Sequence, residues 1–185
     1  KTNFGKMITK KQKLEGVYLF ENEPFEDKRG RFSRHYCMEE FNKVGINFEI
    51  KQTNISENRK SKTLRGFHFQ ISPYAENKIL SCMKGSIHNI VLDLRTKSKT
   101  YLKWQSFKLS DSNRLILYVP VGCANAYMTL TDNTLIFYCH SEFYKSSHYK
   151  SIRYNDPLFK FDWPFAPEVI SDKDKNIENF NPKNK

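Results

Sequence analysis

One short segment of the chain carries polar side chains of types that can do chemistry. It runs Thr63-Leu-Arg-Gly-Phe-His-Phe-Gln-Ile-Ser-Pro73 and alternates like a β-strand. Strand periodicity puts Leu64, Gly66, His68 and Gln70 on one side and Arg65, Phe67 and Phe69 on the other, unless a bulge at Gly66 changes the register. A histidine inside a barrel is costly without a partner or ligand. His68 is therefore either a hydrogen-bonded core residue or a site residue.

Metal binding is the first chemistry to consider for His68. Metal-binding β-barrels of the cupin type place His-x-His on one strand and a Glu and a third His later in the chain. This chain has His68-Phe69-Gln70, followed by Glu76, and it offers Asn125 on the later strand. Because amides are poor ligands for transition metals, we expect no metal, and His68, if it is catalytic, then acts as a free base.

The elements around this segment are predicted to be strands. Six runs are rich in β-branched and aromatic residues, and turn signals separate them. These runs are 16–20, 78–83, 87–94, 101–109, 115–119 and 134–140. Met38–Val44 is the one convincing helix, and Gly45 ends it. The pattern predicts an all-β fold, a jelly-roll barrel or sandwich with few short helices.

Length and composition fit one globular domain over residues 1–185. The chain has 185 residues, of which 38% are hydrophobic, and it shows no repeat or low-complexity linker. We expect residues 1–13 to form a loose or strand-swapped arm and residues 179–185 a peripheral tail. The four cysteines lack a CxxC pair and are expected to be reduced thiols. The sequence has neither a membrane-spanning run nor a signal-like start, so we expect a soluble, cytoplasmic protein with no membrane partner.

Net charge points to an anionic partner. The chain has 31 Lys and Arg against 20 Asp and Glu, a formal charge of +11. The basic residues are dispersed and lack the dense run or aromatic motif of nucleic-acid-binding proteins. We therefore expect no nucleic-acid partner.

Motifs spread along the chain resemble the dTDP-4-dehydrorhamnose 3,5-epimerase family. The similarity runs in order from about Gly16 to Phe180, which makes it far more specific than any single motif. The matching stretches are Asp27-Lys-Arg-Gly-Arg-Phe32, Gln52-Thr-Asn-Ile-Ser56, Leu64-Arg-Gly-Phe-His-Phe-Gln70, Lys78, Val119-Pro-Val-Gly-Cys-Ala-Asn-Ala-Tyr127, Tyr138, Tyr144, Arg153-Tyr-Asn-Asp-Pro157, Asp162-Trp-Pro164 and Ser171-Asp-Lys-Asp174.

The resemblance implies a metal-free cupin jelly roll, usually a homodimer, that acts without a cofactor on a nucleoside-diphosphate 4-keto-6-deoxy sugar, dTDP-linked in the rhamnose pathway. By family position, His68 removes the proton next to the ketone and Asp174 orients and charges its imidazole. Lys78 lies near the ketone oxygen, and Tyr138 returns a proton from the opposite face. Tyr144 stacks on the nucleotide base. The positions that hold the diphosphate, sugar or base are Arg29, Gln52, Asn54, Arg65 and Lys173.

This set of groups suits the chemistry of inversion beside a ketone. The α-proton of a ketone is roughly 12 pK units less acidic than an imidazolium, a gap of about 16 kcal/mol that a histidine alone cannot bridge. A buried cation such as Lys78 stabilises the developing enolate more than the ketone. A second group, here Tyr138, has to deliver a proton to the other face, because one base alone restores the original configuration.

Three positions depart from the family pattern. Asn125 replaces a His near the phosphates, and an amide cannot carry its charge. Arg34 stands where rhamnose-pathway members often have Glu, and Tyr149 replaces an acid near the nucleotide. These changes indicate altered recognition of the base or sugar, with Arg34 and Asn125 as further candidate binding residues.

Two alternatives stay open beside the double epimerase. One is an epimerase that inverts C3 or C5 alone, on a different sugar nucleotide, since one base and one acid can serve either carbon. The other is a cupin that binds a sugar nucleotide without turning it over. The presence of His68, Lys78, Tyr138 and Asp174 favours an enzyme.

Overall fold

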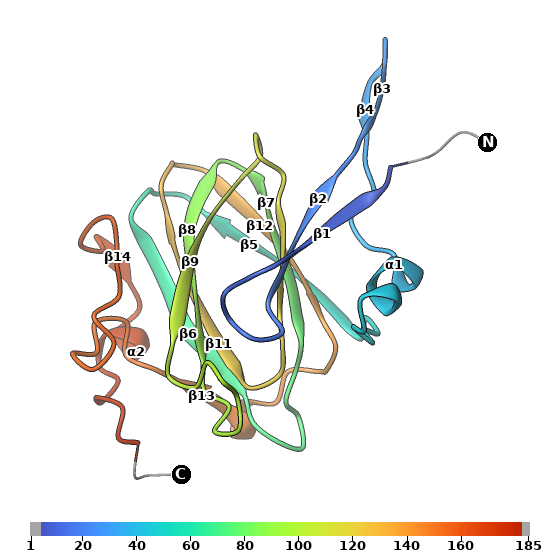
Figure 1. Ribbon diagram of the computed structural model, residues 1–185. Coiled ribbons are helices and arrows are strands. Elements are labelled where there is room, and N and C mark those ends of the chain that lie inside the picture. The colour runs from blue at the N-terminus through green and yellow to red at the C-terminus, as the bar shows by residue number, and fades with distance from the viewer. Residues whose placement is uncertain (1–4, 183–185) are drawn as a thin grey trace.

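Two antiparallel sheets lie face to face and form the body of the molecule. A computed structural model describes residues 5–182 (Figure 1). Sheet I has the order β1 (Met7–Lys11), β2 (Tyr18–Asn22), β10 (Ile116–Val119), β7 (Lys78–Lys84), β12 (Thr134–His140) and β5 (Gln52–Asn58). Sheet II has the order β13 (Tyr149–Ser151), β6 (Thr63–Gln70), β11 (Cys123–Thr129), β8 (Ser86–Asp93) and β9 (Trp104–Ser110), with β14 (Val169–Ile170) parallel to β6.

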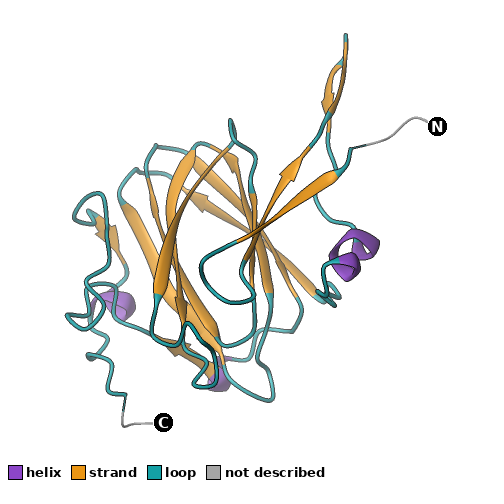
Figure 2. Ribbon diagram, viewed as in Figure 1, coloured by secondary structure: helices purple, strands orange, loops and turns teal. Residues whose placement is uncertain are grey.

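Few residues lie in helices, as Figure 2 shows. Helix α1 spans Met38–Lys43, α2 spans Asp172–Lys175, and a 3-10 turn covers Ser146–His148. The expected all-β architecture with short helices is confirmed, and each of the six predicted runs overlaps a strand. No helix within residues 5–182 is long and apolar enough to cross a membrane.

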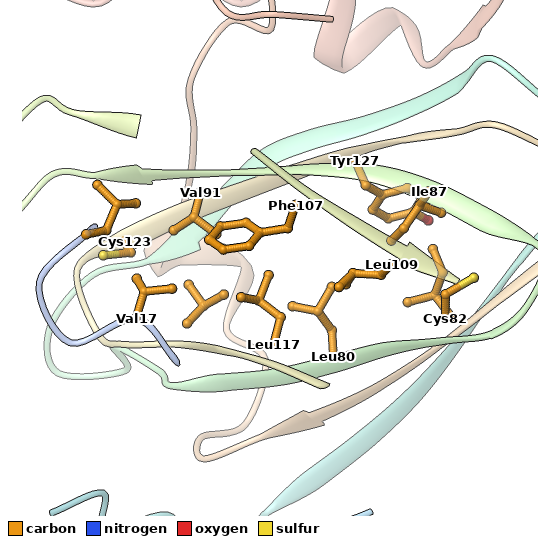
Figure 3. Packing of buried hydrophobic residues seen from close by; sticks show 13 residues of the cluster. Val17, Leu80, Cys82, Ile87, Val91, Phe107, Leu109, Leu117, Cys123 and Tyr127 are labelled. Atoms are coloured by element: carbon orange, nitrogen blue, oxygen red, sulfur yellow. The ribbon is translucent and has the colours of Figure 1, made fainter. Parts of the chain in front are cut away.

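The space between the sheets is filled by aliphatic and aromatic side chains from both of them. Leu80 and Leu117 of sheet I face Val91 and Leu109 of sheet II, and all four are fully buried (Figure 3). Burying such side chains is the main term that stabilises the fold, at about 1.5–3 kcal/mol each. The core occupies one end of the sandwich, so the other end is available for polar side chains.

Two further apolar clusters cover the outer faces of the sheets. Helix α1 packs Phe41 against Phe20 of β2 on the outside of sheet I, with the rings stacked at 4.2 Å. The C-terminal segment lays Phe159, Phe161 and Trp163 over Phe67 and its neighbours on the outside of sheet II. This second layer holds residues 152–180 against β6, the strand that carries His68.

The N-terminal part is more ordered than the expected loose arm. Met7–Lys11 pairs in register with Tyr18–Asn22, from Met7 opposite Asn22 to Lys11 opposite Tyr18. The sequence of β1 is polar and gives no strand signal, because Met7 is its only buried residue. Residues 1–4 of the expected arm and 183–185 of the expected tail lie outside the described residues.

The hairpin of β3 (Phe25–Asp27) and β4 (Gly30–Phe32) stands away from the two sheets (Figure 1). It forms a two-stranded sheet of its own, in which Asp27 pairs with Gly30. Arg29 therefore lies at the tip of a projection, remote from the space between the sheets.

Candidate active site

The polar end of the sandwich contains two adjoining cavities of about 340 and 470 Å³. Both are lined by Arg65, His68, Tyr144 and Tyr149, so they form one cleft with two chambers. The first chamber adds side chains from sheet I, among them Lys78 and Tyr138. The second adds the segment around α2. We call these the inner and the outer chamber.

His68 and Asp174 form a hydrogen-bonded pair between the two chambers. The imidazole Nε2 lies 2.7 Å from Asp174 Oδ1. Burial would raise the pKa of the Asp174 carboxyl, but the hydrogen bond and charge of His68 outweigh it and hold that pKa below its usual value. Because the carboxylate is ionised, Nε2 donates its proton to it, which leaves the lone pair on Nδ1. The pair has the geometry of an oriented general base.

The short helix α2 places Asp174 beneath His68. Ser171 caps the helix, and its hydroxyl accepts a hydrogen bond from the Asp174 backbone N–H at 3.1 Å. Asp174 is 4% exposed, and its Oδ2 accepts from the Gly66 N–H at 3.4 Å. The carboxylate is therefore fixed by its own helix and by the strand that carries the histidine.

A bulge at Gly66 brings Arg65 and His68 to the same cleft. On β11, Asn125 pairs with His68 and Tyr127 pairs with Arg65, so β6 has one more residue between the pairs than β11 has. Gly66 has φ +109°, and a Cβ there would lie 2.7 Å from the Asn125 carbonyl oxygen. Only glycine fits this approach. Simple alternation, which put Arg65 and His68 on opposite sides, is wrong for these two residues, and the anticipated bulge explains why.

Lys78 places a buried ammonium in the inner chamber. Its Nζ donates to the His68 carbonyl oxygen at 3.0 Å and to Asn125 Oδ1 at 3.3 Å, and it lies 3.4 Å from Glu76 Oε1. Burial lowers the pKa of Lys78 below its usual value, while the Glu76 carboxylate acts in the opposite direction. The two longer contacts are weaker than the first, so a substrate oxygen can replace either of them.

Tyr138 comes from sheet I, which faces the strand that carries His68. It lies on β12 opposite Leu80 of β7 and Asn54 of β5, and it lines the inner chamber. Burial raises the pKa of its phenol well above the usual value, and the nearby Tyr127 adds to the effect. Tyr138 therefore stays protonated and can act as a proton donor.

Most of the predicted binding residues also meet in this cleft. Gln52 and Asn54 of β5 line the inner chamber, and Lys173 lines the outer one. Arg65 faces both chambers, and its Nε donates to Asn58 Oδ1 at 2.9 Å. Asn125 is buried beside Lys78. Tyr144 is half exposed at the mouth.

Arg29 and Arg34 do not line the cleft of their own chain. Arg29 forms a local ion pair with Asp27, and its side chain is 86% exposed. Arg34 lies before α1 and contacts Glu40 in the first turn of that helix at 2.5 Å. Arg29 lies on the projecting hairpin, and Arg34 lies next to α1, which packs Phe41 on the outer face of sheet I.

Three residues of the cleft have partners that the sequence did not reveal. Glu76, noted only as a possible metal ligand, bonds His140 Nδ1 at 2.8 Å. His140 stood out only as the end of a strand run. Tyr149, noted as a departure, places its ring 5.0 Å from the ring of His68 and lies under the Lys173 ammonium. The pairing of β12 with β7 sets His140 opposite Lys78, and this register is the signal that could have placed His140 in the cleft.

Comparison with known proteins gives a consistent result. The family model described as dTDP-4-dehydrorhamnose 3,5-epimerase matches residues 11–182. A protein of that name from Shigella flexneri is 33% identical over 171 residues, which cover 92% of this chain and 94% of the relative.

Two solved structures illustrate the range of similar folds. A dTDP-4-dehydrorhamnose 3,5-epimerase from Bacillus anthracis, with TDP and PPi bound, superposes with a TM-score of 0.91 at 31% identity and covers 95% of this chain and 100% of that one. ChmJ, a 3'-monoepimerase from Streptomyces bikiniensis in complex with dTDP-quinovose, gives 0.84 at 27% identity, covering 91% and 85%.

Proposed function

The chain belongs to the dTDP-4-dehydrorhamnose 3,5-epimerase family, and on that premise we propose that it inverts C3, C5 or both in a dTDP-linked 4-keto-6-deoxy sugar through an enolate. The family assignment makes it an isomerase that acts on nucleotide-linked keto sugars. The residue roles and the identity of the sugar are the proposal. We treat residues 1–185 as one catalytic domain, in line with the match over residues 11–182.

Proton removal is the first step. His68 takes the proton on the carbon next to the ketone, through the Nδ1 lone pair that its bond to Asp174 leaves available. The C–H electrons move into the carbonyl and form the enolate, while His68 becomes an imidazolium. Asp174 stabilises that cation across the 2.7 Å contact. No change of oxidation state occurs, so the step needs no redox cofactor.

Lys78 stabilises the enolate oxygen. Its ammonium exchanges a contact to Asn125 or Glu76 for one to the substrate oxygen, whose negative charge grows during the step. A preorganised donor in a buried site typically contributes a factor of about 10²–10³ to the rate. The low-dielectric inner chamber strengthens this contact compared with water.

Protonation by a residue of sheet I completes the inversion. Tyr138 on β12 faces β6 across the chamber and donates its phenolic proton to the second face of the enolate carbon. The C–H bond forms again with the opposite configuration. Tyr138 is left as a phenolate and His68 as an imidazolium, and proton exchange with solvent through the open cleft resets both.

One observation supports this proposal above the others. A carboxylate-oriented histidine, a buried lysine and a protonated tyrosine, from strands of two facing sheets, line one connected cleft. The outer chamber, with Lys173 and Tyr144, has the charge and the aromatic ring to take part of a nucleoside diphosphate. Relatives of known structure bind TDP and dTDP-quinovose.

We further propose a homodimer. Arg29, a predicted ligand of the substrate, cannot reach the cleft of its own chain from the tip of the β3–β4 hairpin. It can bind substrate only if the hairpin extends over the cleft of a second copy. Light scattering should therefore give twice the mass of the chain, and Arg29→Ala should weaken dTDP binding. A monomer that binds dTDP would contradict the arrangement.

The cytoplasmic location remains a proposal as well. All four cysteines are free thiols in the structure, three of them are buried, and burial raises the pKa of Cys123 to about 12. Buried, protonated thiols suit a reducing compartment.

Deuterium exchange tests the function. The wild-type protein is incubated in D2O with 4-keto-6-deoxyglucose linked to dTDP, GDP, CDP or UDP, and NMR follows C3 and C5. We expect deuterium to enter one or both positions with the dTDP-linked sugar. Lack of exchange with every nucleotide would contradict an epimerase and leave a sugar-nucleotide-binding cupin.

The same spectra separate the two epimerase readings. Similarity to a 3'-monoepimerase keeps inversion at C3 alone as a second candidate. Exchange at both carbons, with both configurations changed, identifies a double epimerase. Exchange confined to one carbon identifies a mono-epimerase.

A further inference from the structure

The cleft contains a second histidine–carboxylate pair besides the one used for proton removal. His140, the last residue of β12, has Nδ1 2.8 Å from Glu76 Oε2. The Glu76 side chain is 7% exposed, and its other oxygen contacts Lys78. Burial would raise the pKa of Glu76, but the bond to His140 and the charge of Lys78 hold it below its usual value. Glu76 is thus an ionised acceptor for both neighbours.

A line of hydrogen bonds continues from His140 to the mouth of the cleft. Its Nε2 lies 3.2 Å from Asn54 Nδ2, and Asn54 Oδ1 lies 3.2 Å from Gln52 Nε2. Gln52 Oε1 then accepts from the Tyr144 backbone N–H at 3.1 Å. The register of β5 with β12 builds this line, because it sets Gln52 directly opposite His140.

The donors and acceptors in this line fit together in one way only. A backbone N–H can only donate, so Gln52 turns its carbonyl oxygen to Tyr144 and its NH2 to Asn54. Asn54 accepts with Oδ1 and must donate with Nδ2 to His140. The imidazole therefore accepts at Nε2 and donates from Nδ1 to Glu76. A proton on Nε2 would face the NH2 of Asn54, and turning that amide would in turn place the NH2 of Gln52 against the Tyr144 N–H.

We propose that His140, oriented by Glu76, is a positioning residue that holds the amides of Gln52 and Asn54 in one orientation for the nucleotide part of the substrate. The inference rests on the proposed function, because it takes these amides as ligands of a nucleoside diphosphate. Each amide uses one N–H in the line and keeps a second for an acceptor oxygen of the ligand. The line also joins the Tyr144 backbone to the Glu76–Lys78 pair, so it connects the mouth of the cleft to the inner chamber.

The effect should appear in binding and not in the chemical step. His140 faces amides and a carboxylate, while proton transfer and enolate stabilisation are done by other groups. Loss of the line frees two amides to rotate, and part of the binding free energy then goes into ordering them. One or two neutral hydrogen bonds correspond to about a tenfold change in affinity.

Two substitutions and a control test the proposal. His140→Phe removes both hydrogen bonds and keeps a ring next to Tyr138, whose ring centroid is 5.8 Å away. His140→Gln supplies an N–H for Glu76 and a carbonyl oxygen for Asn54, so it preserves the pattern. His88→Phe is the matched control, since it removes a histidine–carboxylate bond, to Asp162 at 3.2 Å, outside the cleft.

Calorimetry with dTDP and steady-state kinetics give the readout. We expect His140→Phe to weaken dTDP binding and raise KM by about tenfold, with kcat within about twofold of wild type. His140→Gln should bind dTDP within about threefold of wild type, and His88→Phe should match wild type.

Several results would overturn the proposal. Unchanged dTDP affinity in His140→Phe, or a fall in kcat at constant KM, would contradict a positioning role. A tenfold loss of dTDP affinity in folded His140→Gln would also contradict a positioning role. This second variant still tests the proposal if His140→Phe does not fold. Failure of the wild-type protein to bind dTDP would contradict the proposed function itself, and this inference with it.

Discussion

Buried charge occurs in two regions of the molecule whose surroundings differ. At the end of β8, Asp93 is fully buried and accepts hydrogen bonds from the Arg95 guanidinium at 2.8 and 2.9 Å and from the Thr100 hydroxyl at 2.6 Å. These two donors lie within seven residues of it in the sequence. We call this region the Asp93 corner. None of its three side chains lines either chamber of the cleft.

In the cleft, the paired charged residues come from segments that are far apart in the sequence. Asp174 and His68 are 106 residues apart, and Glu76 and His140 are 64 apart. These four residues line the cleft, to which both sheets contribute side chains. Buried charges whose bonds are all satisfied by neighbours stabilise a loop, whereas charges assembled around a space from distant segments are available to a ligand. The comparison predicts that changes in the cleft alter activity and changes in the corner alter stability.

A large loss of activity is expected from Lys78→Gln. It removes the cation that stabilises the enolate, so kcat should fall by about 10³. The single variant leaves Glu76 without its cation and should also lose stability. The double variant Lys78→Gln/Glu76→Gln restores the charge balance and should recover stability but not turnover. Thermal unfolding and kcat separate the two effects, and turnover in either variant above about a tenth of wild type would contradict the role of Lys78.

Tyr138→Phe should separate exchange from inversion. Without the phenol the enolate still forms, and His68 returns a deuteron to the face it came from. In D2O we expect label to enter with retained configuration, while inverted product falls by about 10². Tyr118→Phe, which removes a buried hydroxyl bonded to Asn77 on the other side of sheet I, is the control. Equal loss of exchange and inversion would assign Tyr138 a different role.

Asp93→Asn should affect stability alone. The amide places an NH2 where Asp93 accepts several bonds, and Arg95 loses its counter-ion. We expect the free energy of unfolding to fall by about 3 kcal/mol, with kcat unchanged where the variant is folded. Urea unfolding and kinetics at low temperature measure both. A loss of kcat without a loss of stability would reverse the distinction between the regions.

Low pH should also destabilise the Asp93 corner, by less than the substitution Asp93→Asn does. Burial would raise the pKa of Asp93, but bonds from Arg95, Ser98 and Thr100 lower it to about 2, from an ordinary 3.8. Because the folded-state pKa is the lower one, this stabilisation is complete above about pH 4 and is lost as the pH falls toward 2. It amounts to about 2 kcal/mol. The acid-induced loss should be smaller by that amount in Asp93→Asn, and an identical loss in both proteins would contradict it.

Hydrophobic patterning predicted the frame of the fold well. Runs such as 134–140 alternate buried and partly buried positions, and their strands begin and end within a few residues of the prediction. Strand β5 escaped detection because Gln52–Asn58 lies at the edge of its sheet and is polar throughout, apart from Ile55. Helix α2 was missed since four residues carry no periodic signal, and its Ser171 cap could have indicated it.

The composition of the site was predictable, and the family resemblance also paired Asp174 with His68, but the remaining contacts between its side chains were not predicted. Family motifs selected His68, Lys78, Tyr138 and Asp174, and the structure brings all four to one cleft. Which acid meets which histidine depends on register and on the bulge at Gly66, and neither is encoded by local propensity. The bond between Glu76 and His140 is of this kind.

The most direct test of the account compares His68→Asn with wild type in one experiment. Deuterium uptake from D2O into the dTDP-linked keto sugar reports proton removal, and calorimetry reports dTDP binding. The account predicts that exchange falls by about 10³ or more while dTDP affinity stays within about threefold. Exchange at the wild-type rate in His68→Asn would contradict the assignment of His68 as the base.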